Sequence, residues 1–336
     1  MIRECPPMNA DQPFKPLRMP RIASIDVARG LALVAMAIYH FTWDLSFFGY
    51  VAPDLAITGG WRIFARLIAT SFLFLVGVSL ILAHGNGIRW QGFWKRFWMV
   101  AVAALLITVA TYFLTPPTYI FFGILHHIAL ASLLGLLFLR LPPVIVAVAA
   151  VIVAVLPFYA SSDFFDPRYL AWTGLAERAP RSNDLVPLFP FFAAVLAGIA
   201  ATKLALEFGL AERLSLVGVA KALKPLETAG RHSLLFYLVH QPVLIGFVWV
   251  FSQVVPPPPV RFSETEFSSM CMRTCTQERD GAFCTAYCGC MLDRFKADVS
   301  LFEQLQRQDD LAAQENIVRV ANQCSLQTEQ LKLPSN

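Results

Sequence analysis

Long apolar stretches alternate with short polar or proline-rich segments from residue 25 to residue 254. An apolar run of about 20 residues is long enough to cross the hydrocarbon core of a bilayer as an α-helix. The pattern predicts about seven membrane-spanning helices, at residues 25–48, 62–83, 97–115, 119–139, 143–160, 186–206 and 231–254. The proline pairs Pro116-Pro117 and Pro142-Pro143 lie between spans, where a missing backbone donor costs least.

Composition agrees with this pattern. The chain has 336 residues, of which 57% are hydrophobic and only 15% are charged, with a net charge of +4. These values exclude an ordinary soluble domain and indicate a polytopic membrane protein. Residues 1–24 are rich in proline and have no apolar core, so we do not expect a cleavable signal peptide there.

Basic residues predict the orientation. Lysine and arginine occur together in the N-terminal arm and in the loops at residues 84–96 and 203–229, and seven spans would place all three on one side. The positive-inside rule makes that side cytoplasmic, which puts the C-terminus outside. The loop at residues 161–185 has mixed charge and weakens this assignment a little.

After the proline run at residues 256–259 the chain becomes polar and contains six of the seven cysteines. The spacing of Cys271, Cys275, Cys284 and Cys288 places each pair on one face of a helix, so a hairpin turning at Asp280-Gly281 would join Cys271 to Cys288 and Cys275 to Cys284. Cys290 and Cys324 would then hold a helix near residues 291–322. Six cysteines nevertheless allow 15 pairings.

Disulfides compete with a structural zinc site as the explanation for these cysteines. We favour disulfides because the segment contains no histidine and the predicted location is oxidising. The predicted fold class is therefore all-α: a polytopic membrane helix bundle with a small disulfide-stapled helical module. Its parts are a cytoplasmic arm at 1–20, a transmembrane domain at 21–254, a proline-rich linker at 255–262 and a periplasmic Cys-rich helical-hairpin module at 263–336.

Ionisable and polar side chains lie inside several predicted spans, where they are costly and by default indicate a functional site. Near the cytoplasmic end of the first span are Asp26 and Arg29; deeper in the bundle are His40, Asp44, Arg66, His126, His127, Tyr237 and His240. Each also has a structural explanation. Asp26 and Arg29 would form a capping ion pair, and His240 would repair the helix break at Pro242.

Histidine and a carboxylate at mid-membrane suit proton transfer. His40 can take a proton from a hydroxyl or amine that attacks an acyl carbon, and Asp44 can orient the imidazole. Arg29, beside Asp26, can hold phosphates at the cytoplasmic mouth, as binding of acyl-CoA would require. The same residues also suit proton-coupled transport.

Four segments resemble a known family. Residues 21–40 (RIASIDVARGLALVAMAIYH) are similar to the opening helix of the transmembrane acyltransferase superfamily. Residues 61–80, 122–130 and 230–244 (GRHSLLFYLVHQPVL) resemble the bacterial branch of the heparan-alpha-glucosaminide N-acetyltransferase catalytic-domain family. The resemblance covers about residues 20–254.

This resemblance implies a membrane enzyme that moves an acyl group, most simply acetyl, from cytoplasmic acetyl-CoA to an extracytoplasmic sugar. In related bacterial O-acyltransferases the functional residues match Arg29 and His40. The lysosomal relative has asparagine where His40 lies and a proposed acetyl-accepting histidine shortly after that helix, but this chain has no histidine between residues 41 and 83. We therefore expect direct transfer with His40 as the base, to an envelope glycan or glycolipid rather than heparan.

The loop at residues 161–185 offers candidates for acceptor binding: aromatic residues that can stack on sugar faces (Phe164, Phe165, Tyr169, Trp172) and carboxylates that can accept hydroxyl groups (Asp163, Asp166, Asp184). The alternative is an interfacial aromatic belt. We expect no metal and no nucleic-acid partner, and a homo-oligomer stays open.

Three hypotheses result from the sequence. The first is an acyl-CoA-dependent N- or O-acyltransferase in a bacterial inner membrane. The second is a proton-coupled transporter or flippase, although we see none of the internal repeats typical of transporters. The third is a non-catalytic assembly protein in which the Cys-rich module supplies the function.

Overall fold

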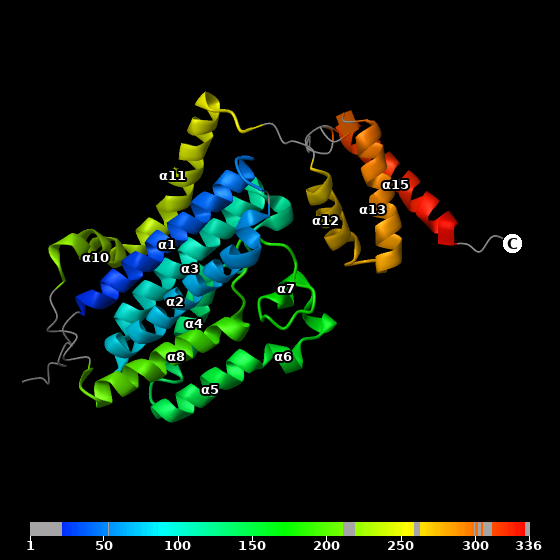
Figure 1. Cartoon of the computed structure of the whole chain (residues 1–336). Helices are drawn as coiled ribbons and strands as arrows, with labels where there is room; N and C mark the ends of the chain where they lie inside the picture. Colours follow the sequence, from blue (N-terminus) through cyan, green and yellow to red (C-terminus); the bar gives the residue numbers. More distant parts are fainter. Residues whose placement is uncertain are drawn as a thin grey trace, which may run out of the picture. The chain divides into compact units, whose positions relative to one another are not determined.

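The computed structural model describes residues 22–52, 54–85, 87–210, 219–258, 263–298, 300–301, 304 and 311–332 (Figure 1). Within these ranges the regular elements are helices, with two isolated β-bridges, so the predicted all-α class is confirmed. The predicted N-terminal arm and residues 211–218 of the basic loop predicted at 203–229 lie outside the described residues.

Five helices are long and apolar enough to cross a membrane: α1 (Ala23–Phe47), α2 (Gly59–His84), α3 (Trp90–Leu114), α8 (Leu188–Glu207) and α11 (Ser233–Val254). The fourth and fifth predicted spans are shorter than expected. They form α4 (Ile124–Leu136) and α5 (Pro143–Val155), which is followed by the single turn α6 (Pro157–Ala160). Thirteen residues rise only about 20 Å, so neither α4 nor α5 crosses a bilayer core by length alone.

Two predicted loops are partly helical. The third span begins at Trp90, which places Lys95 and Arg96 on α3 rather than in a loop. Trp90, Trp94 and Trp98 stack along this first part of α3, and one-turn aromatic spacing favours helix there. Residues Lys224–Arg231 of the next basic segment form α10, just before α11. The remaining short elements are η1 (Leu55–Ile57), η2 (Pro116–Thr118), η3 (Asp163–Phe165), α7 (Arg168–Ala171) and η4 (Lys221–Leu223).

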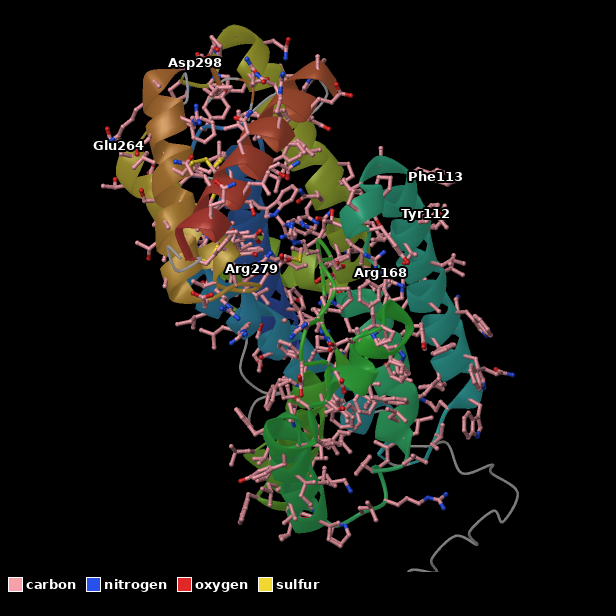
Figure 2. All side chains as sticks on the ribbon, turned by 90° about the vertical axis from the view of Figure 1, so that its right-hand side faces the viewer. Tyr112, Phe113, Arg168, Glu264, Arg279 and Asp298 are labelled. Carbon is pink, nitrogen blue, oxygen red and sulfur yellow. A yellow bond between two sulfur atoms is a disulfide. The ribbon has the colours of Figure 1, made fainter. Side chains whose placement is uncertain are left out.

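Large apolar side chains are exposed on the outer faces of the bundle. On α3 they include Leu105, Leu106, Phe113 and Leu114, and on α11 they include Phe247 and Val250. Figure 2 shows Tyr112 and Phe113 pointing away from the other helices. So much exposed apolar surface on long helices requires an apolar solvent, and the chain is therefore a membrane protein.

Two helix crossings depend on glycine. Gly77 of α2 and Gly198 of α8 each face the backbone of the opposite helix, because a Cβ at Gly77 would collide with the Val195 carbonyl and one at Gly198 with the Phe74 carbonyl. Gly30 of α1 and Gly230 of α10 are packed in the same way, because a Cβ at Gly30 would collide with the Leu226 carbonyl and one at Gly230 with the Asp26 carbonyl. Small residues allow helix backbones to approach closely in membranes, where packing replaces the hydrophobic effect.

The Cys-rich module consists of α12 (Glu264–Cys275), α13 (Gly281–Ala297) and α15 (Leu311–Lys332). It contains the disulfides Cys271–Cys288, Cys275–Cys284 and Cys290–Cys324, which is the pairing that the predicted hairpin requires (Figure 2). Asp280 caps α13 by accepting the Phe283 amide at 2.9 Å. The helix predicted at residues 291–322 is wrong, because α13 continues through Cys290 to Ala297 and α15 starts at Leu311.

The chain divides into two compact units, residues 1–257 and 258–336, so the division falls within the proline run. The exact domain boundaries stay a prediction.

The α2–α8 crossing yields a first testable expectation. Gly77→Ala should lower the free energy of unfolding by about 1–3 kcal/mol, since the added methyl group forces two helix backbones apart. Gly246→Ala is the matched control, because a Cβ there meets no neighbouring atom within 4 Å. Thermal unfolding in detergent measures both. Equal melting temperatures for the two variants would contradict the close crossing.

Candidate functional site

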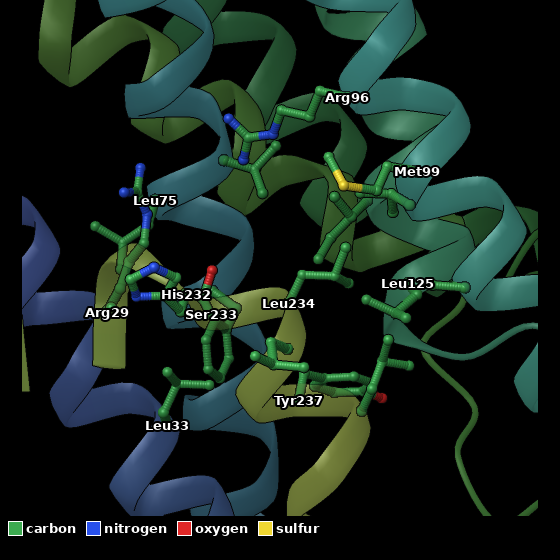
Figure 3. Close-up of a pocket in the computed structure, with 18 of the residues that line it drawn as sticks. Arg29, Leu33, Leu75, Arg96, Met99, Leu125, His232, Ser233, Leu234 and Tyr237 are labelled. Atoms are coloured by element: carbon green, nitrogen blue, oxygen red, sulfur yellow. The ribbon is translucent and has the colours of Figure 1, made fainter. Parts of the chain in front are cut away.

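A cavity of about 690 Å³ lies among α1, α2, α3, α4 and the start of α11. Its walls are mostly apolar and include Leu33, Val76 and Leu125. Figure 3 shows Arg29 and Arg96 at one end of the cavity and Tyr237 at the other. The cavity is therefore polarised: it is cationic at one end and apolar with a phenolic hydroxyl at the other.

The cationic end is organised around Asp26. This carboxylate is buried, with 2% of its surface exposed, and receives Arg29 at 2.8 Å and Arg231 at 3.8 Å. Arg29 also donates to the Ser79 hydroxyl on α2, and Arg231 pairs with Glu227. The capping ion pair expected between Asp26 and Arg29 is thus present, but it also joins α1 to α10 and fixes two guanidinium groups at the cavity.

No acidic residue is among the described residues that line this cavity, whereas Arg29, Arg96, Arg231 and His232 all line it. Arg96 comes from α3, on the opposite wall from Arg29 (Figure 3). Guanidinium groups that converge without a lining carboxylate favour an anionic ligand, because planar paired donors match phosphate oxygens.

At the other end, the Tyr237 hydroxyl is hydrogen-bonded to Asp184. Asp184 also accepts the Ile124 amide at 3.0 Å and so caps the start of α4. Gly123 has no side chain and leaves room for this carboxylate. Burial raises the pKa of Asp184 to about 6, although both hydrogen bonds oppose that shift. Asp184 was expected to bind acceptor hydroxyl groups, yet here it holds the tyrosine that closes the cavity.

His40 and His240 lie side by side, with ring centroids 5.0 Å apart. His240 Nδ1 is 2.7 Å from the Tyr237 carbonyl oxygen, in the turn before Pro242. When the imidazole is neutral, Nδ1 must donate to this carbonyl, so Nε2 carries a lone pair. That Nε2 atom is buried and has no partner among the described residues. His40 itself does not line the cavity. It contacts His240, and the His240 ring lies 5.6 Å from the ring of Tyr237, which does line the cavity.

We had expected Asp44 to orient His40, but this expectation is wrong. Asp44 instead accepts a hydrogen bond from Gln241 Nε2, at 2.7 Å. Asp44 is fully buried. Asp44 Oδ2 and Gln241 Oε1 have no further partner among the described residues. His40, Asp44, His240 and Gln241 therefore form one polar patch between α1 and α11, with three buried acceptor atoms free.

The other predicted site residues lie elsewhere. His126 accepts the Gly123 amide at 3.1 Å and contacts Thr108 at 3.0 Å, which is a capping role. His127 is fully buried and bonds the Val186 carbonyl at 3.1 Å. Arg66 is exposed on α2 and does not join the polar patch.

In the predicted acceptor loop, Phe164 and Tyr169 are exposed, while Trp172 packs against Phe122. The described residues contain no cluster of metal ligands.

Several residues of the site were missed from the sequence. Arg96 was assigned to a loop, and Arg231 and His232 were read only as part of a motif. The polar residues Ser79 and Gln241, each inside an apolar span, were the signals that could have identified partners for Arg29 and Asp44.

A family model described as "Heparan-alpha-glucosaminide N-acetyltransferase, catalytic" matches residues 21–242. The chain belongs to this family. The resemblance suspected from four sequence motifs is thereby confirmed, and the match contains every residue of the cavity and of the polar patch. No curated protein and no solved structure matches the chain detectably.

Membership of this N-acetyltransferase family indicates a membrane acetyltransferase. The Cys-rich module lies beyond the matched residues, so the family describes the helix bundle and not the module.

The pairing of Asp44 with Gln241 can be tested by a double-mutant cycle. Asp44→Ala and Gln241→Ala should show a coupling free energy of about 1 kcal/mol, the scale measured for side-chain hydrogen bonds between membrane helices. Gln253→Ala, on the same helix but exposed, should show no coupling to Asp44→Ala. The readout is unfolding in detergent. If the changes in unfolding free energy of Asp44→Ala and Gln241→Ala were strictly additive, this would contradict the hydrogen bond between the two side chains.

Proposed function

We propose that the protein is an integral-membrane acetyltransferase that takes an acetyl group from acetyl-CoA and passes it to a sugar or glycolipid on the other side of the membrane. The observation that carries this proposal is the polarised cavity, with arginines at one end and Tyr237 at the other. An acyl-CoA has the same polarity, since its phosphates are anionic and its thioester end is uncharged.

In this proposal the diphosphate binds at Arg29, Arg96 and Arg231. The pantetheine arm follows the apolar walls, and the thioester lies next to Tyr237. Arg29 is prepared for this role because Asp26 and Ser79 hold its guanidinium in place before the ligand arrives. Preorganised donors bind a charged ligand without paying for reorganisation.

His40 is the proposed base. As the amine or hydroxyl of the acceptor attacks the thioester carbonyl, His40 takes its proton, the C–S bond breaks, and the proton returns to the thiolate to give CoA. His240 lies against His40, and its buried Nε2 atom has no partner among the described residues. Asp184 positions Tyr237 where the donor and the acceptor would meet.

The proposed orientation puts the arginine end of the cavity in the cytoplasm, where acyl-CoA is available, in a bacterial inner membrane. The positive-inside rule supports this side for the loops flanking α1, α3 and α10. The proposed orientation would put the Cys-rich module in the periplasm, and the three disulfides of that module suit an oxidising compartment. The acceptor is then an envelope glycan or glycolipid.

Binding of the donor tests the cationic end of the cavity. Arg96→Ala should weaken binding of CoA about 10- to 100-fold, because a hydrogen bond to a charged group contributes roughly 1.5–3 kcal/mol. Lys95→Ala is the matched control, since Lys95 is a neighbouring exposed cation on α3 that does not line the cavity. Calorimetry on the detergent-purified protein measures both. Equal CoA affinities for the two variants would contradict the placement of the diphosphate.

Transfer tests His40. Purified protein is incubated with radiolabelled acetyl-CoA and either an α-linked glucosaminide or an extract of envelope glycans. His40→Ala should lower the rate about 100- to 10,000-fold, the usual contribution of a general base. Thr42→Ala is the control on the same helix, because its hydroxyl bonds only the Ile38 carbonyl of α1 among the contacts described. Equal labelling by the wild type and His40→Ala would exclude His40 from the mechanism.

A further inference from the structure

The cavity of about 690 Å³ that would bind the donor is called the donor cavity below. A second hollow of about 660 Å³ opens next to it, at the end of α2 and the start of α3. We call it the Trp90 basin; its lining includes His84, Arg89, Trp90, Gln91 and Arg96. The proposed function does not use this basin.

A small hollow of about 30 Å³, which we call the neck, has lining residues in common with both the basin and the donor cavity. The neck shares Ser79 and Val100 with the cavity and Ala83 and His84 with the basin, while Arg96 lines all three. Along α2, the lining residues of the three hollows extend from Phe72 to His84, which is about 18 Å at 1.5 Å per residue. The cavity and the basin share Arg96, so one elongated ligand that lies against Arg96 could contact both.

The basin presents hydrogen-bond donors with positive charge. His84 Nδ1 accepts the Arg89 amide at 3.2 Å, so the neutral imidazole carries its proton on Nε2 and is a donor there. Arg89 Nε donates to the Ala83 carbonyl at 3.2 Å, which fixes its guanidinium at the rim of the basin. No carboxylate is among the described lining residues of the cavity, neck or basin.

The basin also contains an exposed aromatic ring. Trp90 has 53% of its surface exposed and stacks on Trp94, with ring centroids 6.4 Å apart and an interplanar angle of 21°. A tryptophan held by a neighbour in this way offers a flat surface to a base, and base–aromatic stacking is worth about 1–3 kcal/mol.

We propose that the Trp90 basin binds the adenosine 3′-phosphate end of the donor, with the adenine stacked on Trp90 and the 3′-phosphate held by Arg89. This inference rests on the proposed function and extends it to the nucleotide. CoA carries two separate anionic groups, and the arginines lie in two places to match: Arg29, Arg96 and Arg231 for the diphosphate, and Arg89 for the 3′-phosphate. Arg96 lines both hollows.

A membrane phospholipid is the other source of phosphate near Trp90. Its single headgroup phosphate would use the basin alone and would leave the neck and the donor cavity without a role. The position of Arg96 in the lining of both the donor cavity and the basin favours one ligand that contacts both.

The test compares CoA with 3′-dephospho-CoA, which differs only by the phosphate assigned to Arg89. Wild-type protein in phosphatidylcholine nanodiscs should bind CoA at least about 10-fold more tightly than 3′-dephospho-CoA. Arg89→Gln should lose this preference by weakening CoA alone. Arg231→Gln should weaken both ligands and keep the preference.

Matched variants separate stacking and folding from phosphate recognition. Trp90→Ala should weaken both ligands about 5- to 100-fold, whereas Lys95→Ala, which removes an exposed cation that does not line the basin, should leave both affinities unchanged. Melting temperatures of Arg89→Gln and Arg89→Lys identify any loss of folding, and Arg89→Lys should retain part of the preference.

The outcomes distinguish this inference from the proposed function. If the wild type binds neither ligand, the proposed function fails together with the inference. If it binds CoA and 3′-dephospho-CoA equally, with or without phosphatidylglycerol in the nanodisc, the donor cavity stands and the basin is not a nucleotide site. A preference that survives Arg89→Gln in folded protein also overturns the inference.

Discussion

The arrangement of the bundle depends on one buried carboxylate. Asp26 is almost completely removed from solvent, and two arginines from different helices, Arg29 and Arg231, are directed at it. A buried carboxylate without such partners would be strongly unfavourable, so α1 and α10 must come together at this level. Gly30 and Gly230 make that approach sterically feasible, because a side chain at either position would collide with the opposite backbone. Since α11 follows α10 immediately, this contact also sets the level along α1 at which Tyr237 and His240 lie.

The same contact explains the charge of the cavity. Asp26 and Glu227 pair with Arg29 and Arg231, and Arg96 adds a further cation from α3, so the lining carries positive charge that favours an anionic ligand. In an apolar surrounding such charge is costly, and the cost is justified where an anion binds. The opposite end is lined by apolar side chains and by the Tyr237 hydroxyl, without lining cations. There Asp184, Tyr237, His240 and His40 join elements that are distant in the chain.

Much of the fold could be predicted from the sequence because the solvent is apolar. In a membrane each spanning helix must satisfy its own backbone, so a long apolar run such as residues 62–83 indicates a helix directly. The two disulfides between α12 and α13 match the hairpin hypothesis, because a spacing of four residues sets one face of a helix and an antiparallel hairpin brings two such faces together, although six cysteines alone left 15 pairings open. The lengths of α4 and α5 could not be predicted, since their ends depend on tertiary contacts such as the Asp184 cap on Ile124.

The site was predicted less completely, for the same reason. The motif residues Arg29 and His40 were identifiable one by one, but their partners were not. Nothing in the local sequence shows that Asp44 would be held by Gln241, 197 residues further along the chain, or that Arg96 would turn toward Arg29 from a helix assigned to a loop. Such pairs are set by helix packing, which a single sequence does not contain.

The central claim is that one passage takes the donor from the arginines to Tyr237. Photocrosslinking with a short acyl-CoA that carries a diazirine at its acyl end tests this directly, by locating the labelled residues with mass spectrometry. The account predicts labels on Leu125, Leu234 or Tyr237 at the inner end of the cavity, and their loss when excess CoA is added. Labels confined to the lipid-facing side of α3 or α11, or labels that persist in excess CoA, would contradict it.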